Sequence, residues 1–139
     1  MRKHVLLIDD DADDIELFKE ALFEADPEST FHYYDDAALL INRMDHLKNN
    51  KPDIIFLDIN MTSISGWDCL NMLREYNLLT SIPVIMYSTS SHKKEVEQAL
   101  NEGAWGFVTK PSNYKQLIQL LQKILYTPET KLREILSVI

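Results

Sequence analysis

Residues 54–61, with the sequence IIFLDINM, decide the fold class of this chain. The apolar run leads straight into a carboxylate, with Pro52 before it and Gly66 after it. This pattern is typical of a strand that is buried on both faces of a sheet. Asp58 then stands at the carboxyl end of the strand, which is the edge where open α/β sheets bind ligands. The segment predicts a parallel sheet with a functional carboxylate at its rim.

Length and composition describe a single globular domain. The chain has 139 residues, of which 45% are hydrophobic and 26% are charged. Its 22 acidic and 14 basic side chains give a net charge of −8, which argues against nucleic-acid binding because phosphates are held by clustered Lys and Arg. A lone Cys69 excludes an internal disulfide, and the amino terminus has no apolar run long enough for a membrane. We expect a cytoplasmic protein.

Strand and helix patterns alternate along the chain. Short apolar or aromatic runs predict further strands at 5–8, 30–34, 83–87 and 106–109, the second of them at a sheet edge. Helical spacing predicts helices over 13–25, through 40–47 as one helix, from Trp67 to Arg74, over 96–100 with Gly103 as its cap, and over 114–125. The alternation predicts a three-layer α/β domain with a parallel sheet and helices on both faces.

The last residues form a separate element. Leu132, Ile135, Leu136 and Ile139 recur at helical spacing after Pro128. We therefore predict one domain over 1–127 and a short amphipathic helical extension over 128–139. A dozen residues cannot form an output domain.

Polar residues directly follow the inner strands. They are Asp9 and Asp10, then Asp58, Ser88 and Lys110. Because the carboxyl ends of parallel strands meet at one edge, we expect these side chains to form a single site. Crowded carboxylates repel one another, and a hard divalent cation such as Mg²⁺ relieves that repulsion.

The predicted metal site has defined ligands. Asp10 and Asp58 would bind Mg²⁺ directly, Asp9 through water, and Asn60 through its backbone carbonyl. If Asp58 is a nucleophile, the reaction is phosphoryl transfer to a carboxylate. Lys110 and the Ser88 hydroxyl would then contact two of the phosphoryl oxygens.

These landmarks resemble the receiver domains of two-component response regulators, the fold of the bacterial chemotaxis regulator, over about residues 4 to 126. The resemblance implies a flavodoxin-like fold of the single-domain type, with five parallel strands in the order 2-1-3-4-5. It also implies a role for each landmark: an acidic pair at Asp9 and Asp10, a phosphoacceptor at Asp58, a carbonyl metal ligand at Asn60, phosphoryl-binding and switch residues at Ser88, Thr89, Lys110 and Phe107, and a cis-linked proline at Pro111.

The resemblance implies partners as well. A sensor histidine kinase or a histidine phosphotransfer protein would donate its phosphoryl group to Asp58. Ser88 would then move toward that group and Phe107 would turn inward, which changes a surface that a downstream protein reads. Such a protein is a phosphoacceptor rather than an enzyme, and a homodimer is also compatible with the resemblance.

Three features depart from the pattern or stand outside it. Thr62 occupies a place where the family often has proline, which predicts a more mobile loop. Trp105 lies where the family usually has a small residue, so it is either an exposed partner or dimer contact or folds back over the last helix or the tail. The four histidines have no metal-ligand spacing and are expected to be structural or solvent-facing.

Other functions remain open at this stage. A haloacid dehalogenase-type phosphatase would also use an aspartate nucleophile, but it usually carries a second Asp where this chain has Asn60. A nucleotide or flavin binder would need a glycine-rich phosphate loop, and the chain has only three Gly. A receiver that serves only as an interaction module is a further alternative.

Overall fold

The computed structural model describes residues 2–62, 64–90 and 92–139. They contain a five-stranded sheet in the order β2-β1-β3-β4-β5, and every strand pair is parallel. The strands are β1 (His4–Ile8), β2 (Thr30–Tyr34), β3 (Ile54–Asp58), β4 (Val84–Ser88) and β5 (Gly106–Thr109). The predicted strands, their parallel pairing and the strand order are all confirmed.

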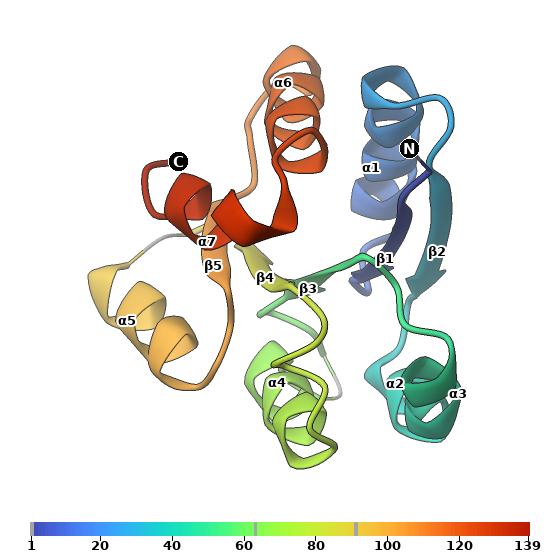
Figure 1. Ribbon diagram of the computed structural model, residues 1–139, viewed down its shortest axis with the longest axis vertical. Coiled ribbons are helices and arrows are strands. Elements are labelled where there is room, and N and C mark those ends of the chain that lie inside the picture. Colours follow the sequence, from blue (N-terminus) through green and yellow to red (C-terminus); the bar gives the residue numbers. More distant parts are fainter. Residues whose placement is uncertain (1, 63, 91) are drawn as a thin grey trace.

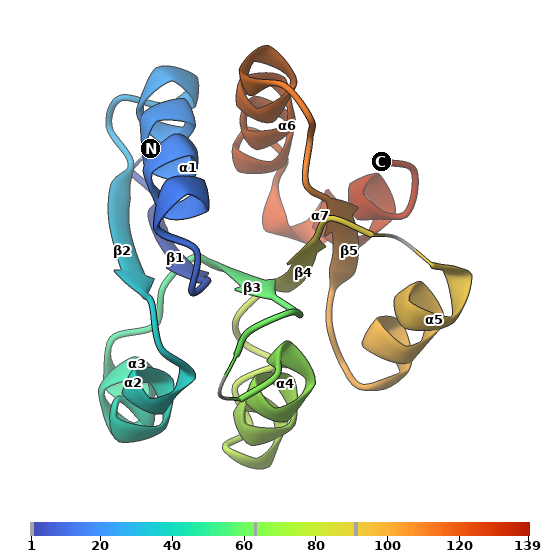
Figure 2. The same ribbon diagram turned by 180° about the vertical axis from the view of Figure 1, so that it is seen from behind.

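Helices cover both faces of the sheet (Figure 1 and Figure 2). On one face lie α1 (Ala12–Ala25) and α6 (Tyr114–Leu125), and on the other lie α2 (Ala37–Asn42), α3 (Met44–Asn49), α4 (Gly66–Glu75) and α5 (Lys93–Asn101). Each face therefore has its own apolar core. Phe56 of β3 joins the first core, where its ring meets that of Phe18 with centroids 5.0 Å apart. All five residues of β3 are buried, as a central strand requires.

Two helix boundaries show how local chemistry sets the elements. α1 begins at Asp11, whose carboxylate accepts hydrogen bonds from the backbone N–H groups of Asp13 and Asp14. α5 ends before Gly103, whose φ of 103° is readily available only to glycine. That residue is the predicted cap.

The single helix predicted through 40–47 is wrong. The chain forms two short helices that meet at Arg43, where the backbone N–H bonds to the carbonyl of Leu40, three residues back rather than four. Ile41, which the predicted single helix counted among its apolar positions, is 43% exposed.

The tail forms α7 (Glu129–Leu136) and packs against β5 of its own chain. Leu132 and Leu136 are buried, and a Cβ at Gly106 would lie 2.7 Å from the Cβ of Leu136. Glycine at 106 therefore admits the close approach of α7. None of the helices in the described ranges is long and apolar enough to cross a membrane.

Candidate functional site

The predicted carboxylates meet at the carboxyl edge of the sheet. Asp9 and Asp10 follow β1, and Asp58 is the last residue of β3. One ligand atom from each of the three lies within 4.8 Å of the others. Asp9 and Asp58 are buried, whereas Asp10 is half-buried. Oxygen donors at this spacing fit a small hard cation such as Mg²⁺.

Lys110 is bound to this cluster. Its Nζ lies 2.9 Å from Asp9 Oδ2 and 3.6 Å from Asp58 Oδ1. It also lies 2.8 Å from Oδ2 of Asp14, in the first turn of α1. The sequence interpretation missed Asp14, because an acid at a helix start is explained by the helix dipole alone. Its place one turn after the acidic pair is the signal that could have identified it.

The electrostatics of Asp58 are unusual for a carboxyl group. Its pKa is raised to about 6, because burial and, to a smaller extent, the negative charge of Asp9 raise it more than Lys110 lowers it. Burial also raises the pKa of Asp9, against hydrogen bonds from the Asp11 N–H and from Lys110. Burial would lower the pKa of Lys110, but its hydrogen bonds to Asp14 and Asp9 outweigh that and raise it. The site therefore contains one ammonium group, held in place by carboxylates, and its carboxylates outnumber that single positive charge.

Asp10 is held by the loop after β3. Thr62 donates its backbone N–H and its hydroxyl to Oδ2 of Asp10, at 2.8 and 3.1 Å. A proline at 62 has no N–H to donate. Asn60 donates its backbone N–H to Asp58 Oδ1 at 3.4 Å. The loop thus contacts both predicted direct metal ligands.

The hydroxyl and aromatic positions lie on adjacent strands. Ser88 ends β4 and is buried, and its Oγ accepts the backbone N–H of Ser90 at 3.3 Å. Thr89 is exposed. Phe107 of β5 pairs in register with Met86, two residues before Ser88, and both side chains belong to the core on the α5 face. Phe107 is only 9% exposed, so its ring already points inward.

The cis linkage predicted at Pro111 is wrong. No cis peptide bond occurs among the described residues, so the Lys110–Pro111 bond is trans. Both isomers are compatible with a Lys-Pro sequence, because the tertiary amide makes their energies similar. The Lys-Pro sequence therefore does not predict which isomer the bond adopts.

Trp105 is not a free aromatic side chain. Its Nε1–H donates to the carbonyl of Leu79 at 2.9 Å, and the guanidinium of Arg133 in α7 lies 4.2 Å from the ring centroid. Of the two interpretations of the sequence, this arrangement favours the one in which Trp105 folds back against the tail.

The fold is a doubly wound α/β fold. The acidic edge is a candidate divalent-cation site at the topological switch point of the sheet, where the strand order reverses. Comparison with known proteins identifies the class more closely. The sequence profile of the response regulator receiver domain matches residues 5–122. The chain belongs to this family.

Curated relatives differ in how much of their length the chain spans. DivK of Brucella anthropi, a polar-differentiation response regulator, is 25% identical over 125 residues, which cover 90% of this chain and 98% of DivK. The chemotaxis protein CheY of Halobacterium salinarum is 26% identical, with the same coverage. NarL of Escherichia coli is 36% identical over 52% of this chain, and the match spans only about a third of that protein, 32%.

Solved structures share the fold. The Mn²⁺-bound response regulator Rcp1 superimposes with a TM-score of 0.74 at 25% identity, covering 88% of this chain and 91% of Rcp1. The phosphorylated cyanobacterial phytochrome response regulator RcpA gives a TM-score of 0.74 at 27% identity, covering 89% of this chain and 91% of RcpA. The receiver fold predicted from the sequence is confirmed.

Proposed function

We propose that this receiver domain accepts a phosphoryl group on Asp58 in a magnesium-dependent reaction and signals through a changed protein-binding face. The observation that carries this proposal is the placement of Asp58 between two further carboxylates and the ammonium of Lys110. A buried carboxylate can act as the nucleophile, and the fixed cation beside it can stabilise the negative charge of the phosphoryl group.

The proposed transfer starts from a phosphohistidine of a sensor kinase or a phosphotransfer protein. An Asp58 oxygen attacks the phosphorus, an O–P bond forms, and the N–P bond breaks with its electron pair returning to the imidazole of the donor. Asp9, Asp10, Asp58 and the Asn60 carbonyl would hold Mg²⁺. When bound, that ion supplies positive charge against the phosphoryl oxygens.

The chain's own residues would handle the rest of the charge. Lys110 is already fixed by Asp9 and Asp14, so it can pair with a phosphoryl oxygen without a large search of rotamers. The Ser88 hydroxyl, buried at the end of β4, would donate to another oxygen, and Thr89 lies beside it at the exposed rim.

The output of the proposed switch is a protein contact. A shift of Ser88 toward the phosphoryl group would change the packing next to Phe107, because their strands are paired in register. The surface around β5 includes α5 and the docked α7, which also contacts α6. A downstream protein would read this surface, with residues 1–127 as the receiver and 128–139 as its extension. We place this protein in the cytoplasm, with no nucleic-acid or membrane partner.

A labelling experiment tests the proposal against its alternatives. Incubation with acetyl phosphate and Mg²⁺ should give hydroxylamine-labile label, which Asp58→Asn and removal of Mg²⁺ should abolish. A phosphatase would release phosphate continuously from small substrates, and a pure interaction module would take up no label. Undiminished labelling of Asp58→Asn would contradict the proposal.

A further inference from the structure

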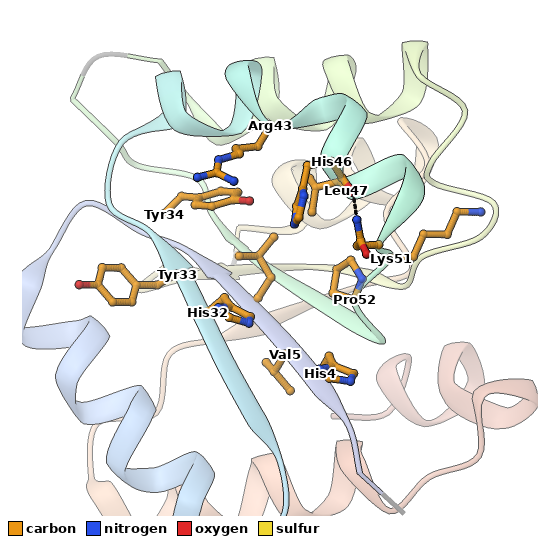
Figure 3. Close-up of a pocket in the computed structure, with 12 residues that line it drawn as sticks. His4, Val5, His32, Tyr33, Tyr34, Arg43, His46, Leu47, Lys51 and Pro52 are labelled. Atoms are coloured by element: carbon orange, nitrogen blue, oxygen red, sulfur yellow. Dashed lines mark hydrogen bonds between the residues drawn. The ribbon is translucent and has the colours of Figure 1, made fainter.

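A hollow lies between the β1–β2 strand pair and α3 (Figure 3). Its volume is about 600 Å³, within the range of small-molecule sites. The two helices over this half of the sheet, α2 and α3, have six residues each and meet at Arg43, which lines the hollow. The strand residues that line it include His4 and His32, whose side chains are exposed.

The lining has a charge opposite to that of the chain. Among the residues that the structure describes, no Asp or Glu lines the hollow, although the chain has 22 acidic and 14 basic side chains. Its polar wall is built from cationic, imidazole, hydroxyl and amide groups, and its apolar part is Val5, Leu6, Leu47 and Pro52. Among the described residues, neither Arg43 nor Lys51 forms an ion pair with a carboxylate. Unpaired cations beside an apolar surface favour an anionic ligand with an apolar body.

Several donors converge at one end of the hollow. Figure 3 shows Arg43 next to Tyr34 and His46 pointing from α3 toward the strands, whereas the Lys51 amine points away from them. Burial raises the pKa of Tyr34, and the positive charge of Arg43 opposes this effect. The Tyr34 hydroxyl, the Arg43 guanidinium and the His46 ring can all donate to one anion.

The three imidazoles do not make a metal site. Within the described ranges, the metal-ligating side chains that cluster in threes are Asp9, Asp10 and Asp58, not the histidines of the hollow. His4 is also engaged elsewhere, because its Nδ1 contacts the hydroxyl of Thr30. The lining fits an anion better than a cation.

We propose that this hollow is a binding site for a small organic anion. A phosphate or carboxylate group would be held by Arg43, Tyr34 and His46. A flat or apolar body would lie against Leu6, Leu47 and Pro52. The site is separate from the acidic edge, since no residue in the described ranges belongs to both.

Calorimetric titration of the full chain tests this proposal. The probes are AMP, adenosine, citrate and inorganic phosphate, in buffer without Mg²⁺. AMP or citrate should bind with a Kd of about 1 mM or tighter, and adenosine at least about tenfold more weakly than AMP. Tighter AMP binding would identify an organic phosphate, and tighter citrate binding a carboxylate. Asp58→Asn should bind the same probes equally well, so this test does not depend on the phosphoacceptor function.

Variants distinguish anion binding in the hollow from a general effect of the protein's positive charges. Arg43→Gln should weaken binding about tenfold, and His46→Gln provides a second test on α3 if the first variant unfolds. Lys48→Gln is the matched control, because it removes one positive charge from an exposed position of α3 outside the hollow. The proposal is overturned if no anion binds at about 10 mM, if adenosine or inorganic phosphate binds as tightly as the tighter of AMP and citrate, or if the Arg43 and Lys48 variants bind alike.

Discussion

Thr62 donates both its backbone N–H and its hydroxyl to the same carboxylate oxygen of Asp10, at 2.8 and 3.1 Å. The two residues come from different strand-end loops, 52 positions apart in sequence. This contact restrains the least buried member of the acidic cluster. It also connects the loop after Asp58 to the loop after β1. Thr62 therefore orders the site by hydrogen bonds that a proline at this position could not donate.

Replacing Thr62 with proline should weaken Mg²⁺ binding. The variant removes both donors to Asp10, and loss of a partner that orients a metal ligand typically reduces affinity about tenfold or more. Thr62→Ser keeps both donors and is the control. Direct Mg²⁺ titration by calorimetry measures the change, and equal affinities of the proline and serine variants would contradict an orienting role.

Asp14→Asn should loosen Lys110. The variant leaves Lys110 with two of its three carboxylate partners, so the free energy of unfolding should fall by about 1 kcal/mol. Asp13→Asn removes a charge from the same turn of α1 without touching Lys110 and controls for the helix dipole. Urea unfolding compares the two, and an equal loss in both would show that the ion pair adds nothing.

The stability of the metal-free protein should fall as pH rises from about 4 to about 6. The folded pKa of Asp58 is raised to about 6 from an ordinary 3.8, so in this window the folded state binds more protons than the unfolded state. Ionisation of Asp58 therefore opposes folding above pH 6, by at most about 3 kcal/mol.

Urea unfolding in EDTA at several pH values measures this effect. Asp58→Asn should remove the fall caused by Asp58 and be more stable than the parent at pH 7.5. Because Asp9 shifts in the same direction, part of the slope should remain. A parent protein whose stability rises from pH 4 to 6 would refute the assignment.

Gly106→Ala should displace α7. The added Cβ would meet the Cβ of Leu136 at 2.7 Å, and overpacking of this kind typically costs about 1–3 kcal/mol. Hydrogen exchange over 129–136 should rise. In a Leu136→Ala background, Gly106→Ala still brings its Cβ against the Cβ of residue 136, but the contacts with Cγ and Cδ1 are gone. The cost of Gly106→Ala should therefore be smaller in that background. Identical costs in both backgrounds would contradict the packing of Leu136 against Gly106.

Much of the site was predictable because parallel strands impose it. Once alternating apolar runs indicate a parallel sheet, residues such as Asp9 and Asp58 must meet at one edge, whatever the details of packing. The parallel sheet and the carboxylate cluster follow from that geometry, whereas the receiver fold followed from the resemblance of the landmark residues to that family. The partners of these residues do not, because Asp14 and Thr62 reach the site from a helix and a loop whose side-chain directions depend on tertiary packing.

The sequence by itself determined the order of strands and helices, the buried strand that ends in Asp58, and the set of acids, hydroxyl and ammonium at the sheet edge. These depend on residue type and spacing along one chain. Tertiary structure alone decided the break at Arg43, the docking of α7 on Gly106, the cover of Arg133 over Trp105, and the trans bond at Pro111. The docking of α7 and the cover over Trp105 depend on contacts between distant segments, and the break at Arg43 and the isomer at Pro111 on small local energy differences. Neither leaves a periodic pattern in the sequence.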